Sequence, residues 1–403
     1  MSDHGRDRYD RYPPAQGAYP SPLAQPLRPD APGVAPAPGA TAGIPTVRVR
    51  RIGAAAIWGL AVLAVLLAVL VAYFLAALGV GASIAGMVLA LVPLTVVLLA
   101  LRAVDRWEPE PRLLVVLAVA WGAIGAVAIA LGVDLVLRLA FGPGDSAAAD
   151  ALGAVVQAPV VEELAKGLGV LLILLAGRRA FDGPVDGIVY GGLIGAGFAF
   201  TENIQYFGIA LIEGGATQTT VTFFLRGILS PFAHVMFTAV TGFAVGLAVR
   251  RGRAVAGPWF AGVVGAMALH ALWNGSSVLG DFFALYLVLQ VPLFILFVVG
   301  VIALRAEEAR LTRERLGEFA AAGWFTAEEV RLLATGSGRR AALAWAGRLR
   351  PDRRPQMRAF IREATALAAS RQRVLTGRDP GAAAEQQALL ARTQAARRAL
   401  FAA

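Results

Sequence analysis

The stretch Ala158-Pro-Val-Val-Glu-Glu-Leu-Ala-Lys166 places two adjacent carboxylates and an amine inside an apolar run over residues 152–176. A run of this length can cross a bilayer, and a lone charge near its middle costs about 3 kcal/mol or more. Glu162 and Glu163 precede Lys166, the only lysine of the chain, by four and three residues. Either carboxylate can therefore pair with the amine on one helix face. The pair either locks the register of a membrane helix or polarises a carboxylate for chemistry.

The composition is that of a membrane protein. Of 403 residues, 57% are hydrophobic and only 16% are charged, and the mean hydropathy is +0.65. These values predict an all-α, polytopic membrane helical bundle rather than a soluble domain. Cysteine is absent, which excludes disulfides, a thiolate metal site and a cysteine nucleophile. The net charge of +10 comes from arginines at the ends of apolar runs and in the C-terminal region, which favours contact with anionic lipid and not with nucleic acid.

Three regions are expected along the chain. Residues 1–50 are rich in Pro, Ala and Gly without an apolar period, and predict a disordered cytoplasmic tail. Residues 51–304 predict a transmembrane domain of about eight helices. Residues 305–403 are rich in Ala, Leu and Arg and predict short cytoplasmic helices, with a basic face that either lies on the inner leaflet or is solvated. Besides the helix of the Glu pair, the expected spans are 54–78, 83–101, 113–139, 185–211, 223–249, 257–279 and 282–304.

The arginines predict the orientation. With residue 54 on the cytoplasmic side, each connection on that side carries arginine, whereas those near 79, 142–150, 213–220 and 280 carry neither arginine nor lysine. This distribution satisfies the positive-inside rule with both termini cytoplasmic. Abundant Ala, Gly and Arg with a single lysine is typical of a GC-rich bacterial genome, so we expect a multi-pass protein of a bacterial plasma (inner) membrane.

Four consecutive spans carry polar groups at membrane depth. The polar side chains lie about 14 to 18 residues from the inner end of their spans, or roughly 21–27 Å at 1.5 Å per residue. Apart from His4, the two imidazoles among them are the only histidines of the chain. We therefore expect one layer of titratable groups just past the midplane. Its members are Glu162, Glu163, Lys166, Glu202, His234, His270 and Asn274.

One chemistry open to this layer uses a metal. Two imidazoles and a carboxylate are a common ligand set for a catalytic Zn²⁺ that keeps an open position for water. In this scheme Glu163, His234 and His270 bind the metal while Glu162 takes the proton. The chain contains no His-Glu-x-x-His motif, so composition and depth alone support this reading.

The other chemistry is independent of metal. A glutamate activates a water molecule while His234, His270 and Asn274 stabilise the oxyanion. His270 and Asn274 are four residues apart and so share a helix face. Glu202 is either a catalytic group or a partner of Lys166.

The polar groups lie in four short motifs. These are Glu-Glu-Leu-Ala-Lys at 162–166, Gly-Phe-Ala-Phe-Thr-Glu-Asn at 197–203, Pro-Phe-Ala-His at 231–234 and His-Ala-Leu-Trp-Asn at 270–274. Together they resemble the PrsW family of intramembrane proteases, relatives of the CAAX-processing and bacteriocin-processing membrane endopeptidases, over residues 113–304.

The resemblance implies cleavage of a membrane-embedded protein substrate, which in the type member is an anti-sigma factor. It also implies that Glu162, Glu163 and His234 are in the active site. The wider group's His-x-x-x-Asn motif fits His270 and Asn274. Lys166 stands where that wider group usually has arginine, which matches PrsW and makes the CAAX enzymes more distant.

The alternative function is a proton- or cation-coupled transporter, because intramembrane Glu, Lys and His also form proton relays. A transporter is expected to show matching halves and polar groups at several depths. Here no internal repeat is visible and the polar groups occupy one depth in spans four to seven. A scaffold would leave the carboxylate pair without a purpose. The residues favour an intramembrane endopeptidase, and leave its substrate and oligomeric state open.

Overall fold

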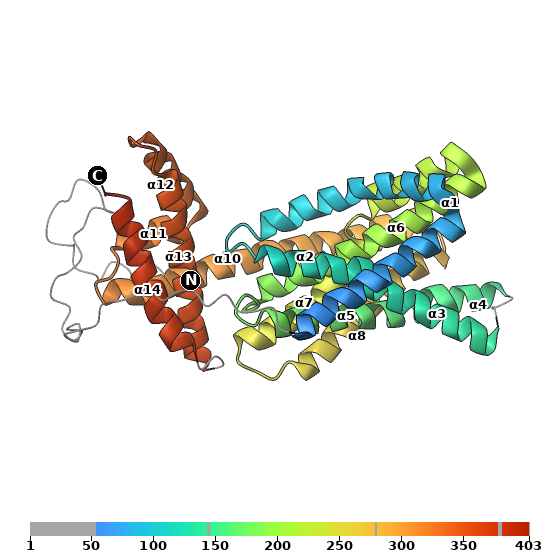
Figure 1. Cartoon of the computed structure of the whole chain (residues 1–403), viewed down its shortest axis with the longest axis horizontal. Coiled ribbons are helices and arrows are strands. Elements are labelled where there is room, and N and C mark those ends of the chain that lie inside the picture. Colours follow the sequence, from blue (N-terminus) through green and yellow to red (C-terminus); the bar gives the residue numbers. More distant parts are fainter. Residues whose placement is uncertain (1–53, 143–145, 279, 378–380, 403) are drawn as a thin grey trace. The chain divides into compact units, whose positions relative to one another are not determined.

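The computed structural model describes residues 54–142, 146–278, 280–377 and 381–402, all of which are helical or in short connections (Figure 1). The expected all-α fold is confirmed. The disordered tail predicted for residues 1–50 lies outside the described residues. Contacts divide the chain into two compact units, of which one is Ile52–Arg305 and the other contains Ala306–Ala403.

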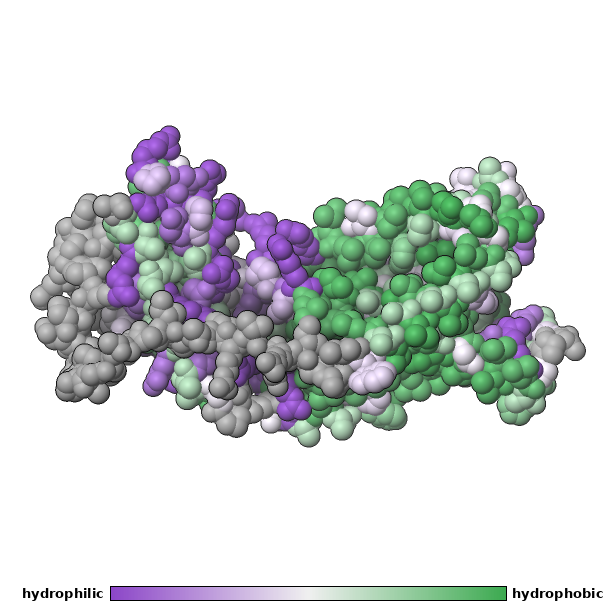
Figure 2. Space-filling model, viewed as in Figure 1, coloured by the Kyte–Doolittle hydropathy of each residue, from purple (hydrophilic) through white to green (hydrophobic). Residues whose placement is uncertain are grey.

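Five stretches of the described chain are long and apolar enough to cross a membrane, so this is a multi-pass membrane protein. They are Trp58–Val104, Arg112–Phe141, Pro184–Arg250, Ala256–Val278 and Phe282–Ala321. Large apolar side chains cover the outside of the Ile52–Arg305 unit, as Figure 2 shows in green and as lipid contact requires.

The helices of the Ile52–Arg305 unit follow in chain order. They are α1 (Ala54–Val104), α2 (Arg112–Ala120), η1 (Trp121–Ala126), α3 (Val127–Phe141), α4 (Ala147–Leu152), η2 (Gly153–Gln157), α5 (Ala158–Ala176), α6 (Pro184–Phe223), η3 (Phe224–Leu229), α7 (Ala233–Arg250), α8 (Ala256–Val278), α9 (Phe282–Leu285) and η4 (Tyr286–Gln290). Helix α10 (Val291–Ala321) begins in this unit and ends in the other. The η elements are π-helical turns, which are frequent at functional sites.

Two glycines divide long apolar stretches into pairs of spans. Gly79, at φ +74°, interrupts α1, and the Ser83 hydroxyl donates a hydrogen bond across this break to the carbonyl of Phe74 at 3.1 Å. Figure 1 shows the two parts of α1 as blue and cyan rods that meet at the bend. Gly215, at φ +59°, interrupts α6 in the same way. Positive φ favours glycine because it has no Cβ.

The expected span 223–249 is not one continuous helix. It consists of η3 and α7, separated by Ser230, Pro231 and Phe232. Pro231 has no N–H and its ring disfavours the preceding helical residue, so the helix must restart. His234 consequently lies in the first turn of α7 and not in mid-helix. Irregular backbone at membrane depth is tolerated where it lines a protein cavity.

Helices α6 and α7 pack through glycines four residues apart. A Cβ on Gly195 would lie 2.3 Å from the carbonyl oxygen of His234, and one on Gly191 would lie 2.5 Å from the carbonyl oxygen of Thr238. Small residues at this spacing let helix backbones approach closely in membranes. The glycines therefore set the height of His234 and Thr238 relative to α6.

The second unit is a helical assembly with its own core. It contains the end of α10 and helices α11 (Ala327–Leu333), α12 (Gly336–Arg348), α13 (Arg354–Thr376) and α14 (Ala382–Ala399). Leu316, Met357, Phe360, Leu367 and Leu389 are buried at its centre. Its described surface is mainly hydrophilic (Figure 2), so burial of these side chains and not lipid contact stabilises the unit.

Candidate active site

Helix α5 is held in place by two tryptophans on either side of its lysine. The indole N–H of Trp121, from η1, donates to the carbonyl of Ala165 at 3.0 Å, and that of Trp259, from α8, donates to the carbonyl of Gly167 at 2.8 Å. These bonds fix the translation and rotation of α5 against its neighbours. The position of Lys166 follows from them.

Lys166 is the centre of the polar cluster. Its ammonium lies 3.1 Å from Glu162 Oε2, 2.8 Å from Glu163 Oε1 and 3.1 Å from His234 Nδ1, and 3.7 Å from the centre of the Phe198 ring. The side chain is fully buried. An ammonium has three N–H donors and no acceptor, so these three contacts satisfy it. The expected ion pair is therefore a junction between both carboxylates and an imidazole.

Glu163 faces away from solvent. Its Oε1 accepts from Lys166 and lies 3.1 Å from His270 Nδ1, and its Oε2 accepts from the Thr238 hydroxyl at 3.1 Å. It is 0% exposed. With both oxygens engaged, Glu163 anchors α5 to α7 and α8.

Glu202 contacts His234 and not Lys166 directly. Its Oε2 lies 2.8 Å from His234 Nε2 and also pairs with the guanidinium of Arg226. Because Nδ1 of His234 accepts from Lys166, Nε2 carries the hydrogen and donates it to Glu202. The carboxylate thus fixes the ring and its tautomer, as carboxylates do for catalytic and metal-binding histidines.

A cavity of about 110 Å³ lies beside this cluster, enough for several water molecules. Helix and loop residues from 154 to 274 line it. Glu162 is among them and its side chain is 12% exposed, so Glu162 is the carboxylate of the pair that can meet water. Asn274 also lines the cavity and donates from Nδ2 to the carbonyl of Ala154 at 2.8 Å. The other polar side chains of the lining are Glu202, Asn203, Tyr206, Arg226, Ser230 and His234.

One group of side chains is arranged so that it could hold a metal ion. Single donor atoms of Glu162, His234 and His270 lie within 4.8 Å of one another. The group has Glu162 where the sequence-based ligand set has Glu163. A carboxylate and two imidazoles suit Zn²⁺, and the donors lie beside a cavity that admits water.

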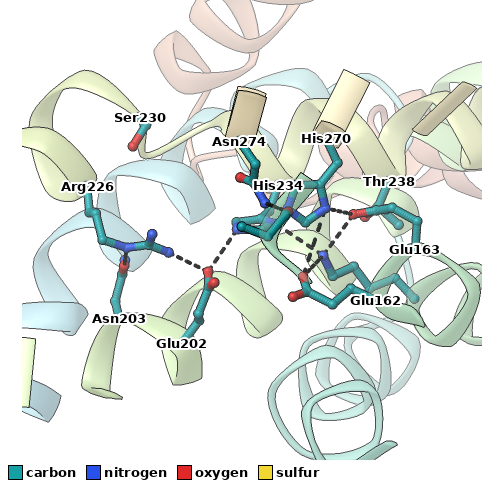
Figure 3. Close-up of polar contacts among 12 residues, drawn as sticks. Glu162, Glu163, Glu202, Asn203, Arg226, Ser230, His234, Thr238, His270 and Asn274 are labelled. Carbon is teal, nitrogen blue, oxygen red and sulfur yellow. Dashed lines mark hydrogen bonds and ion pairs between the residues drawn. The ribbon is translucent and has the colours of Figure 1, made fainter. Parts of the chain in front are cut away.

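Figure 3 shows the resulting order of side chains: Arg226 and Asn203 lie on one side of His234, and Glu163 and Thr238 lie on the other. All the acidic and imidazole groups expected in one layer are joined in this network. Arg226 and Thr238 were not anticipated, and Asn203 was anticipated only as part of the 197–203 motif. Arg226 carried a usable signal, since it is a charge inside the predicted span 223–249.

The fold and this site define a polytopic helical membrane protein with a largely buried carboxylate, ammonium and imidazole network beside a small cavity. Residues 110–298 match the family model described as PrsW family intramembrane metalloprotease. The resemblance to the PrsW family is thereby confirmed over this segment, and the transporter alternative is not favoured.

Two curated relatives carry the name Protease PrsW. The protein of Geobacillus kaustophilus (strain HTA426) is 28% identical over 144 residues, which are 36% of this chain and 58% of that protein. The protein of Clostridioides difficile (strain 630) is 29% identical over 157 residues, which are 39% of this chain and 63% of that protein. The chain thus spans roughly three fifths of the length of these relatives. No solved structure matches it.

Proposed function

We propose that this protein is an intramembrane endopeptidase that hydrolyses a peptide bond of a membrane-embedded protein substrate. The single observation that carries the proposal is the exposure of one carboxylate of a buried pair: Glu162 lines the cavity while Glu163 is fully enclosed. A carboxylate beside water and two oriented imidazoles is the arrangement that general-base hydrolysis needs. The match to the family model supports the same activity.

Glu162 acts as the general base of this reaction. It accepts a proton from a water molecule in the cavity, the water oxygen bonds to the substrate carbonyl carbon, and the proton passes to the departing amine as the carbon–nitrogen bond breaks. Lys166 and His270 hold the pair of carboxylates in place through the contacts described above. Asn274 and His270 are the polar groups available to the oxyanion, whereas His234 is held by Lys166 at Nδ1 and by Glu202 at Nε2.

Glu162, His234 and His270 are the residues that would hold a metal ion. A bound Zn²⁺ supplies Lewis-acid polarisation and lowers the pKa of its water. Elemental analysis of the purified protein separates the two chemistries. One zinc per chain that is lost in His270→Ala would show that His270 binds the ion. Full cleavage by metal-free protein in excess chelator would show that the glutamate acts without a metal.

The substrate is proposed to be a single-span membrane protein similar to an anti-sigma factor. The enzyme is proposed to reside in the plasma (inner) membrane of a bacterium with both termini cytoplasmic, since arginines follow the positive-inside rule at each connection. Cysteine-labelling of the cysteine-free chain tests the orientation. A label on residue 252 that reacts only from outside would overturn it.

The activity is tested by co-expression with a tagged single-span substrate. Glu162→Gln, Glu163→Gln and His234→Ala are expected to abolish cleavage while the amount of protein in the membrane stays the same. Glu213→Gln, a change at an exposed glutamate of α6, is the matched control. Undiminished cleavage by all three site variants would rule out the endopeptidase.

A further inference from the structure

Arg226 is a half-buried cation that the proposed hydrolysis does not use. It lies on the π-helical turn η3, immediately before the break that precedes α7, and its side chain is 23% exposed. The guanidinium lines the same cavity as Glu162 and His234. A charge at this depth is costly unless its environment compensates it, so its neighbours indicate its role.

Three neighbours fix the guanidinium. Its Nε donates to Asn203 Oδ1 at 2.7 Å, its Nη2 pairs with Glu202 Oε2, and its plane stacks on the Tyr206 ring, 3.8 Å from the ring centre. These contacts use one edge and one face of a rigid, planar group. The rotamer is thus set before any ligand arrives, which lowers the entropic cost of binding.

The remaining edge of the guanidinium faces no protein partner. Within the part of the chain that the structure describes, Nη1 makes no hydrogen bond, and Figure 3 draws it without a contact. An N–H group of a charged donor forms a strong hydrogen bond with an acceptor that enters the cavity. Neutralising the charge of Glu202 requires only the contact with Nη2. The need for a counter-charge therefore does not account for the orientation of the whole guanidinium.

The charges around the cavity favour a neutral hydrogen-bond acceptor at the free edge of Arg226. The three carboxylates of the network, Glu162, Glu163 and Glu202, outnumber the two cations, Lys166 and Arg226. An additional carboxylate would therefore meet net repulsion. A carbonyl oxygen carries no charge and accepts the same hydrogen bond.

A protease substrate in the membrane presents such an oxygen. A helix must unwind locally before one of its peptide bonds can be attacked, and the freed backbone carbonyls then need new donors because lipid offers none. We propose that the free edge of Arg226 binds a backbone carbonyl oxygen of the unwound substrate next to the bond that is cleaved. This substrate-binding role rests on the endopeptidase proposed above.

Kinetics of Arg226→Lys and Arg226→Met test this role. Lysine preserves the positive charge beside Glu202 but has no second edge, so both variants are expected to remain in the membrane and to raise KM about tenfold or more, with kcat nearly unchanged, as loss of a charged hydrogen bond predicts. Arg138→Lys and Arg138→Met are the controls, since Arg138 is paired with Asp134 on α3 and does not line the cavity.

A binding measurement separates this proposal from the activity. A synthetic apolar helix of about 20 residues, with glycines at its centre and a fluorophore, is titrated in vesicles against Glu162→Gln and against the double variant with Arg226→Met. The double variant should bind at least about tenfold more weakly. Three results would overturn the role of Arg226. These are equal affinity of the single and double variants for the helix, a wild-type KM in Arg226→Lys, or a fall in kcat at constant KM. Absence of cleavage by the wild type with intact Arg226-dependent binding would instead overturn the endopeptidase.

Discussion

Glu202 Oε2 lies 2.8 Å from Nε2 of His234, on the opposite side of the ring from the 3.1 Å contact between Nδ1 and the Lys166 ammonium. The imidazole is thus held between an acceptor and a donor. Both the ring orientation and the tautomer follow from this arrangement. The proposed role of His234 in hydrolysis should accordingly depend on a residue that need not touch the reacting atoms.

Replacement of Glu202 should reduce cleavage in steps. Glu202→Gln keeps an acceptor for Nε2–H but loses the charge, and we expect a roughly tenfold loss, whereas Glu202→Ala removes the acceptor and should cost about a hundredfold. Imidazole ¹⁵N NMR reports the tautomer directly. The signals can be assigned to individual residues because the chain has only three histidines. A single Nε2–H form retained in Glu202→Ala would contradict the orienting role.

Loss of Lys166 should destabilise the fold. Lys166→Met leaves the buried Glu163 and the cavity-lining Glu162 without their cation, and breaking a buried ion pair costs about 3–5 kcal/mol. Denaturation in detergent measures the free energy of unfolding. Adding Glu163→Gln to Lys166→Met should restore part of the loss, because one uncompensated charge is removed. Strict additivity of the two changes would show that the residues do not interact.

The packing of α6 on α7 should be sensitive to one methyl group. Gly195→Ala places a Cβ 2.3 Å from the carbonyl oxygen of His234, so α7 must shift, at a cost of about 1–3 kcal/mol, and cleavage should fall. Gly132→Ala is the matched control in α3, where a Cβ meets nothing within 4 Å. There alanine should be neutral or slightly stabilising. Equal effects at the two sites would refute the close approach.

Stability should decrease with rising pH because of Glu110, in the connection before α2. Burial raises the pKa of Glu110 to about 9, although a hydrogen bond from Tyr190 opposes the rise. The folded protein therefore binds more protons than the unfolded chain between the ordinary pKa of 4.5 and about 9. Its free energy of unfolding is highest below this window and falls as pH rises through it.

Glu110→Gln should flatten this dependence, since the amide oxygen still accepts from Tyr190 but does not titrate. Thermal unfolding in detergent at a series of pH values checks the result. A weaker dependence of stability on pH should persist in Glu110→Gln at lower pH, because burial also raises the pKa of Asp105 to about 6. An identical pH profile for wild type and Glu110→Gln would disprove the contribution of Glu110.

The sequence by itself determined the membrane-spanning character, the all-α class and the set of polar groups at one depth, because apolar length and helical rise are local properties that need no tertiary contact. It also carried the four motifs that indicate the family. Helical spacing alone correctly paired Lys166 with both glutamates.

Only the tertiary structure decided how these groups divide their contacts. Adjacent carboxylates such as Glu162 and Glu163 are equivalent in sequence, yet they point in directions about 100° apart on a helix, and the packing of α7 and α8 encloses one and leaves the other at the cavity. Arg226 meets Glu202 across 24 residues because the chain bends at Gly215 and turns back. Contacts between distant segments depend on helix rotation and bends, which no local pattern specifies.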